Sequence, residues 1–150
     1  MTLSEKINQD LTTALKARDE LRLSTLRMVK AALKNREIEH RRPLEEAEAQ
    51  QVLSTLIKQR EDAMTQFQAG GRPELAAKEK AEKELIEAYL PQAASPETVE
   101  ATVRAVIAET GASSVKDMGT VMKASMARFQ AAGERVDGKL VSETVKRLLQ

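Results

Sequence analysis

With 150 residues, 41% of them hydrophobic, the chain can form one domain or two small ones that share a core, which excludes general disorder. It contains no cysteine, so disulfide bonds and thiolate chemistry are excluded, and a cytoplasmic location is predicted. The net charge is only +1, but residues 1–42 carry 10 Lys and Arg against 6 Asp and Glu, and residues 43–94 carry 6 against 10. A nucleic acid would therefore have to bind a local basic patch.

The sequence shows neither a membrane span nor a targeting segment. No apolar run approaches the roughly 20 residues that a membrane-spanning helix needs. The first residues, Met1–Lys6, lack the basic head and apolar body of a signal peptide. We therefore expect no membrane partner, and the sequence leaves the oligomeric state open.

Helical periodicity begins at the N-terminus. A capping box, Thr2-x-x-Glu5, precedes the first predicted helix. Asp19 is the predicted cap of a longer second helix, which has a broad apolar face over residues 21–33 and ends before Pro43. The apolar stripe of the first helix has four-residue spacing and consists of Leu3, Ile7, Leu11 and Leu15.

Five more helices are predicted after Pro43. The third stops at Gly70-Gly71 and the fourth at Leu90-Pro91. Ser95 followed by Pro96 is a strong start signal for the first of three shorter helices. No strand-like alternation bounded by turns occurs. The predicted fold is all-α, with an N-terminal four-helix part over residues 1–92 and a C-terminal three-helix bundle over residues 93–150.

Two similar blocks, Asp117-Met118-Gly119 and Asp137-Gly138-Lys139, begin the last two predicted helices. An Asp before a helix can accept hydrogen bonds from free backbone N–H groups, and a Gly beside it lets another surface approach the backbone closely. Neither block supplies a nucleophile, a paired base or a set of metal ligands. The pattern favours a helical docking surface over an active site.

Signals for self-contained chemistry are absent elsewhere too. Glu79 and Glu82 are interleaved with lysines, which is typical of a solvated, ion-paired helix face, and His40 is the only histidine. The serines have no elbow motif, and the glycines form no phosphate-binding loop. We predict no catalytic residue, no metal site and no cofactor. A methionine stripe favours core packing over a binding groove and consists of Met118, Met122 and Met126.

Basic residues in the last third provide one candidate surface. Lys116 and Lys139 flank two predicted helix N-termini, where the helix dipole favours a phosphate. The three aromatic residues all occupy apolar helical positions, so there is no platform for stacking bases. RNA would therefore be bound through its backbone and shape. The candidate nucleic-acid-binding residues are Lys116, Lys123, Lys139, Lys146 and Arg147.

The chain resembles the GatB/YqeY family over nearly its whole length. In the N-terminal half the resemblance is carried by Arg22–Met28, Gln59-Arg60-Glu61, Gly70-Gly71-Arg72 and Tyr89-Leu90-Pro91. In the C-terminal half it is carried by Asp117–Lys123 and Asp137–Ser142. The resemblance implies an accessory module like the tail of the amidotransferase B subunit. Such a module binds tRNA or is associated with tRNA-dependent amidation, with tRNA, an aminoacyl-tRNA synthetase or an amidotransferase as its partner.

The same resemblance leaves enzymatic activity uncertain. The catalytic centres of the amidotransferase lie in other domains, and nothing in this chain matches them. A label such as carbon–nitrogen ligase activity with glutamine as amido-N-donor would be inherited from the larger enzyme. The second predicted helix of the C-terminal bundle departs from the family pattern, because related proteins often carry more Lys and Gly where this chain has Met118, Thr120, Lys123-Ala124 and Ser125.

A helical protein–protein interaction module with no nucleic-acid role is the alternative. The broad apolar face of residues 21–33 is wider than one neighbouring helix can cover, which suggests further burial against a partner or a second copy. In this interpretation Arg22, Arg27 and Arg60 are surface anchors for the partner.

Overall fold

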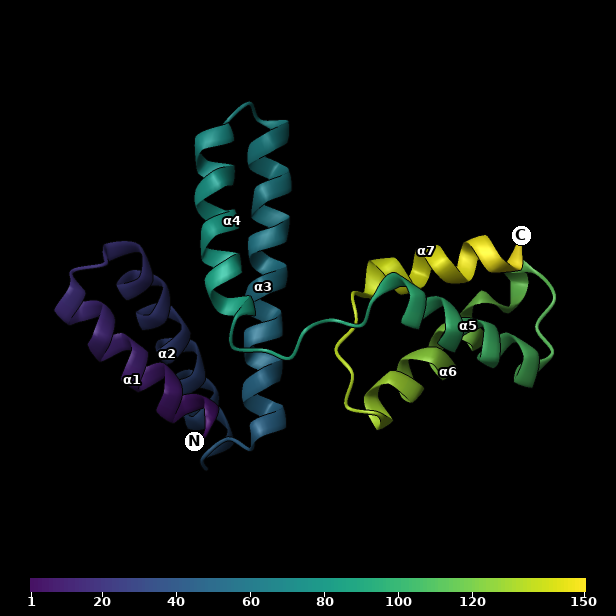
Figure 1. Ribbon diagram of the computed structural model, residues 1–150, viewed down its shortest axis with the longest axis horizontal. Coiled ribbons are helices and arrows are strands. Elements are labelled where there is room, and N and C mark those ends of the chain that lie inside the picture. The colour runs from purple at the N-terminus through teal and green to yellow at the C-terminus, as the bar shows by residue number, and fades with distance from the viewer. The chain divides into compact units, whose positions relative to one another are not determined.

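A computed structural model describes all residues, 1–150, and shows an all-α fold with seven α-helices, one short 3₁₀ helix and no strand (Figure 1). The chain divides into two compact units, Met1–Leu90 and Pro91–Gln150. The first unit contains α1 (Leu3–Ala17), α2 (Glu20–His40), α3 (Glu46–Ala69) and α4 (Pro73–Glu87). The second contains α5 (Pro96–Thr110), the 3₁₀ helix η1 (Val115–Asp117), α6 (Met118–Ala131) and α7 (Gly138–Leu149). No helix is both long and apolar enough to cross a bilayer.

The predicted caps of α1 and α2 are confirmed. The Thr2 hydroxyl accepts from the Glu5 N–H at 3.2 Å, and the Glu5 carboxylate accepts from the Thr2 N–H at 3.1 Å. Asp19 accepts from the Arg22 N–H at 3.2 Å. The carboxylate of Glu46 adds a cap from α3, because it accepts from the Leu3 N–H at 3.2 Å. The start of α1 is thus held by side chains from two helices.

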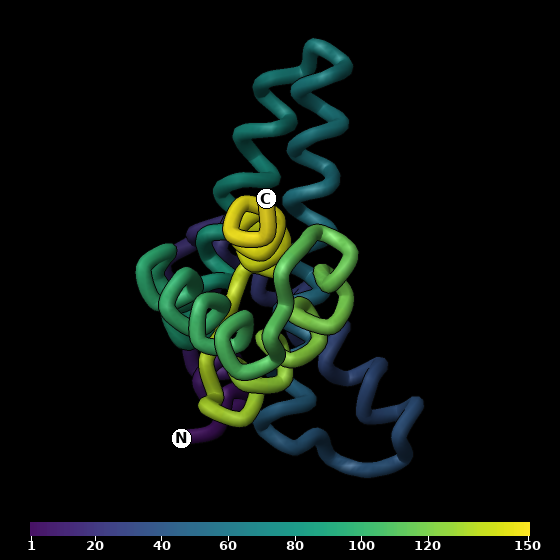
Figure 2. The backbone as a smooth tube through the Cα atoms, turned by 90° about the vertical axis from the view of Figure 1, so that its right-hand side faces the viewer, coloured from purple at the N-terminus to yellow at the C-terminus, as the bar shows by residue number.

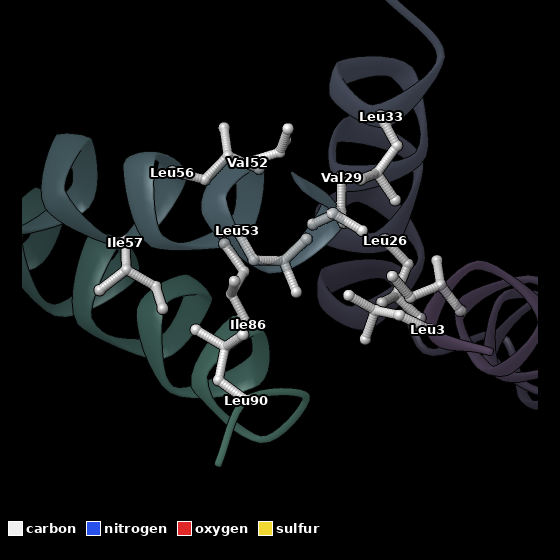
Figure 3. Packing of buried hydrophobic residues seen from close by; sticks show 12 residues of the cluster. Leu3, Leu26, Val29, Leu33, Val52, Leu53, Leu56, Ile57, Ile86 and Leu90 are labelled. Atoms are coloured by element: carbon white, nitrogen blue, oxygen red, sulfur yellow. The ribbon is translucent and has the colours of Figure 1, made fainter. Parts of the chain in front are cut away.

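The core of the first unit is centred on α3. Leu53 points toward Ile86 of α4, while Leu26 and Val29 approach from α2 (Figure 3). All four side chains are almost fully buried. Each side chain of this size contributes roughly 1.5–3 kcal/mol when it is buried. Packing of α2 and α4 against one face of α3 therefore supplies much of the stability of this unit.

The predicted stripe of α1 is correct only for its first half. Leu3 and Ile7 are buried, but Leu15 is 55% exposed and Ala14 takes the buried position instead. Four-residue steps run ahead of the helical repeat of 3.6 residues, so the three steps from Leu3 to Leu15 rotate the side chain by about 120° around the axis. The stripe therefore turns from the core toward solvent, and Leu11 is only partly buried.

The helices α3 and α4 form a hairpin (Figure 2). A cluster of ion pairs around Arg60 joins the two helices. The Arg60 Nε lies 3.1 Å from the Glu82 carboxylate and 3.5 Å from that of Glu79. The interpretation of Glu79 and Glu82 as ion-paired is confirmed, but it is wrong that they are solvated, because their side chains are only 20% and 14% exposed. The ion pairs of Arg60 cross from α3 to α4 and do not run along one helix. The other side of Arg60 contacts the sulfur of Met28 on α2.

Short aliphatic side chains make up most of the core of the second unit. Phe129 is its one aromatic residue, and the buried valines around it are Val99, Val103, Val106, Val121, Val141 and Val145. Met118 and Met122 pack partly against this core, as predicted, whereas Met126 is exposed. The first residues of the unit are held by Arg135, whose side chain donates to the Pro91 carbonyl at 2.8 Å and whose own carbonyl accepts from Ala94 at 2.7 Å.

Replacing Leu53 with Ala should destabilise the first unit by about 2–5 kcal/mol, since a buried leucine leaves a cavity when truncated. Tyr89 is the only tyrosine and the chain has no tryptophan, so tyrosine fluorescence reports on this unit alone. Urea denaturation followed by that fluorescence should show the loss. The exposed Leu15→Ala is the matched control and should change the free energy of unfolding by less than about 1 kcal/mol. Equal effects of the two variants would contradict the placement of Leu53.

Candidate interaction surface

A groove lies between α1 and α2 of the first unit. Its volume is about 180 Å³. Ile7 of α1 and Leu33 of α2 form its apolar floor, and both are buried in the core below. The rim is polar and consists of Ser4, Asn8, Lys30, Lys34 and Glu37. The groove thus combines an apolar bottom with two ammonium groups at its opening.

The α2 side of this groove carries a ridge of free cations. Arg27, Lys30 and Lys34 have the spacing i, i+3, i+7, which places them on one face of the helix. All three are exposed, and none takes part in the ion pairs of the first unit. Arg22 and Arg36 of the same helix, by contrast, pair with Asp19 and Glu39.

Apolar side chains extend from the groove toward the turn between α1 and α2. Leu11 of α1 and Leu23 of α2 are half-buried, and Leu15 near the end of α1 is largely exposed. Burial of more of their surface would be favourable at about 25 cal/mol per Å². The surface made of Ile7, Leu11, Leu15, Leu23 and Leu33, with the cations Arg27, Lys30 and Lys34 beside it, is called the α1–α2 surface below.

Two charge-stabilised contacts join this helix pair to the rest of the first unit. The Arg42 guanidinium donates two hydrogen bonds, 2.7 and 2.9 Å long, to the Glu48 carboxylate, and with the Glu45 N–H it lowers the pKa of Glu48 to about 2. On α1, the Tyr89 hydroxyl donates to Asp10 at 2.5 Å. Burial, and then the Asp10 carboxylate, raise the pKa of the Tyr89 hydroxyl.

The three arginines predicted as protein-interaction anchors have different environments. Arg27 lies on the free ridge, and Arg22 is exposed but pairs with Asp19 at 3.4 Å. Arg60 is not a surface residue, because its side chain is only 16% exposed and lies against two carboxylates. The side chain of Arg60 is thus occupied within its own unit. A role in binding a partner stays a prediction for all three.

The five residues predicted to bind nucleic acid all lie exposed in the second unit. Lys139 and Lys146 share one face of α7 at a spacing of seven residues, and Glu143 lies between them on that face. Arg147 faces Glu100 of α5 at 3.5 Å. Lys116 belongs to η1 and Lys123 to α6. The expected basic patch is therefore interrupted by the Glu143 carboxylate, and one of its members, Arg147, is paired with Glu100.

The two Asp-Gly blocks also differ in detail. Asp137 caps α7 by accepting from the Lys139 N–H at 3.0 Å, as predicted. Asp117 instead accepts from Ser113 and Ser114, which precede α6, at 3.0 and 3.4 Å. A side chain added at Gly119 or Gly138 would meet no atom within 4 Å, so nothing within the chain requires glycine there.

Lys30 and Lys34 are the functional candidates that sequence reasoning missed. The excess of positive charge in residues 1–42 pointed to this region, and the i, i+4 spacing of the two lysines pointed to one helix face. The missing information was which face of α2 the core uses. Without it, these lysines could not be placed beside an apolar groove.

Comparison with known proteins identifies relatives over most of the chain. A family model described as "Yqey-like protein" matches residues 4–149. The chain is 36% identical over 85 residues to "Altered inheritance of mitochondria protein 41, mitochondrial" of Eremothecium gossypii, covering 56% of this chain and 46% of the relative. Proteins of the same name in Lachancea thermotolerans and Kluyveromyces lactis are 34% and 36% identical, each over 69% of this chain and 57% of the relative. The chain spans about half the length of the curated relatives it matches.

These relatives correct two expectations. The function predicted from the resemblance, an accessory module that binds tRNA or serves tRNA-dependent amidation, is wrong, because the relatives are named for the inheritance of mitochondria and neither their names nor the family description mention tRNA or amide transfer. The predicted cytoplasmic location is contradicted as well, since the relatives are named as mitochondrial proteins. The resemblance to the family itself is confirmed by the match to its model.

The contact between Arg42 and Glu48 predicts a pH dependence. A carboxylate whose pKa is lowered in the folded state stabilises the fold above its ordinary pKa of 4.5, and this stabilisation is lost as the pH falls toward about 2. The stability difference between the parent chain and Glu48→Gln should therefore be constant above pH 4.5 and shrink below it. Urea denaturation at a series of pH values, followed by tyrosine fluorescence, measures this difference.

Glu84→Gln is the matched control, since Glu84 is exposed and outside the ion pairs of this unit. This variant should give no comparable change between pH 4.5 and 2. A difference for Glu48→Gln that does not shrink on acidification would contradict the assigned contact.

Proposed function

The chain belongs to the Yqey-like protein family, and we propose that it acts as a helical protein-interaction module whose α1–α2 surface holds the partner. The observation that carries the proposal is the ridge of Arg27, Lys30 and Lys34, three cations without a carboxylate partner beside incompletely buried leucines. Apolar surface bordered by polar groups is typical of sites of protein association. Arg27 keeps the anchoring role expected for it.

The rest of the first unit supports this choice of surface. Two cations of the α3–α4 hairpin, Arg60 and Lys83, are paired with carboxylates of the same unit. The lysines of this hairpin that are exposed and unpaired, Lys58, Lys78 and Lys80, have no exposed large hydrophobic side chain on either helix beside them. Leu15, which does not reach the core, lies on the α1–α2 side. Charge and apolar surface are therefore free together on this side. An interface there would bury leucine surface and give the cations partners.

We further propose that the four-helix part, residues 1–92, and the C-terminal three-helix bundle, residues 93–150, are separate folding modules. The two units have separate hydrophobic clusters, one centred on Leu53 and the other on Phe129. Small helical domains need a core of their own to fold alone. The second unit has such a core although it contains only about sixty residues.

Residues 93–150 expressed alone should show the helix content of the bundle and unfold cooperatively. Circular dichroism during thermal unfolding measures both properties. Val103→Asp, which places a charge in the valine core, is the negative control and should abolish the transition. A non-cooperative loss of signal in the unmodified fragment would contradict a separate module.

A photo-crosslinking amino acid at Ala31 tests the interaction surface. Ala31 is exposed, follows Arg27 by one helical turn and makes no core contact. In cells that produce the chain, irradiation should attach one recurrent polypeptide there, identified by mass spectrometry of the linked peptide. The same group at the exposed Thr65 of α3 is the control and should not capture that polypeptide. Equal capture at both positions, or none at Ala31, would rule out this surface.

A further inference from the structure

We propose that the occupant of the α1–α2 surface is an acidic amphipathic helix of a partner protein. This helix inserts one apolar side chain over Ile7 and Leu33 and places carboxylates against Lys30 and Lys34. The inference rests on the proposed function and adds to it the chemistry of the partner. It follows from the size of the groove, the charges on its rim and the spacing of those charges.

The size and floor of the groove specify an apolar group. A cavity of about 150 Å³ lined by aliphatic side chains is large enough to take up benzene. The groove has about 180 Å³ and a floor formed by Ile7 and Leu33. Its volume is therefore sufficient for one leucine, methionine or phenylalanine side chain placed over that floor. Because it opens to solvent at a rim that includes Ser4 and Asn8, such a group can enter from outside without unfolding the helix pair.

The charges around the opening specify acidic neighbours for that apolar group. Lys30 and Lys34 line the groove, Arg27 continues their ridge, and none of the three forms an ion pair. An uncharged partner would draw water away from these cations without compensating them, and a basic partner would be repelled. Glu37 closes one end of the lining. The carboxylates of the partner therefore lie toward Lys30 and away from Glu37.

The spacing of the cations favours a helix as the partner. Along α2 the steps from Arg27 to Lys30 and from Lys30 to Lys34 are about 4.5 and 6 Å, given a rise of 1.5 Å per residue. Acidic residues at i, i+3 and i+7 of a partner helix reproduce both steps. Same-side residues of an extended strand recur every ~6.7 Å and fall out of step over this length. A groove between two helices also suits an amphipathic helix laid along it.

The test uses the full chain and a labelled synthetic peptide as the probe. The peptide has about five helical turns, with leucines at i, i+3, i+4 and i+7 on one face and glutamates beside them. Fluorescence anisotropy should show saturable binding that weakens as salt is raised, because exposed charges are screened. A peptide with lysine in place of every glutamate should bind at least tenfold more weakly.

Two variants locate the binding. Lys30→Glu with Lys34→Glu should weaken binding by tenfold or more. Lys58→Glu with Lys80→Glu changes the net charge equally at exposed, unpaired sites on α3 and α4, and should leave binding within about twofold. Asn8→Trp places an indole at the rim of the groove and should also weaken binding, while circular dichroism remains that of the parent. Equal losses in both lysine pairs would overturn the assignment, as would undiminished binding by Asn8→Trp.

Failure of the acidic-helix proposal can be distinguished from failure of the proposed function. Capture at Ala31 of a partner segment that is not acidic, together with failure of the glutamate peptide to bind, overturns the acidic helix and leaves the interaction module standing. Capture of a second copy of this chain at Ala31 overturns the partner proposed here in the same way. Octanoate binding that is lost in Asn8→Trp but survives in the presence of saturating peptide would assign the groove to a free amphiphile, and would also overturn the proposal.

Discussion

Burial of one face of α3 between Val52 and Ile57 is the constraint on which the first unit depends. Leu53 on this face meets α2 through Leu26 and Val29 and meets α4 through Ile86. Because α2 turns Leu26 and Val29 toward α3 and α4, the remaining sides of α2 are left to α1 and to solvent. The position of α3 in the core therefore determines which cations of α2 remain free.

The same packing sorts the charges of the unit into two groups. Arg60, Glu79 and Glu82 lie in the angle between α3 and α4, where water is largely excluded and where losing one partner would strand the others. Arg27, Lys30 and Lys34 lie where water reaches them freely. The first group holds two helices in register, and the second is available for association. Composition alone does not distinguish these groups, since both consist of charges interleaved on helices.

Much of the fold follows from local signals in the sequence, and the exceptions have physical reasons. The caps at Thr2, Asp19 and Ser95 are short-range hydrogen bonds, so a few residues suffice to predict them. The exposure of Leu15 depends on the accumulated twist of α1, and the burial of Glu79 depends on a second helix. The bond from Tyr89 to Asp10 joins residues 79 positions apart, which no local pattern reveals.

The candidate site was predictable only in part. Arg27 was predicted as a surface anchor of the N-terminal helices. The two lysines beside the groove were not predicted, because a lysine on a helix is normally an ordinary surface residue. The groove itself is formed by α1 and α2 together, and the local sequence of neither helix reveals how the two pack against each other. The resemblance to the family was carried by short motifs, and the match over residues 4–149 confirms it. The function attached to those motifs did not follow, since a shared fold does not fix a shared partner.

The valine core of the second unit has a consequence for the entropy of folding. Valine has a single side-chain torsion, and in a helix that torsion is already restricted almost to one state. A long side chain loses up to about 2 kcal/mol of rotamer freedom when it is buried, and valine has far less to lose. Six buried valines around Phe129 thus limit the disorder that about sixty residues must give up. In this small bundle, stiff side chains lower the entropy cost of folding, whereas a larger domain would offset that cost by burying more apolar area.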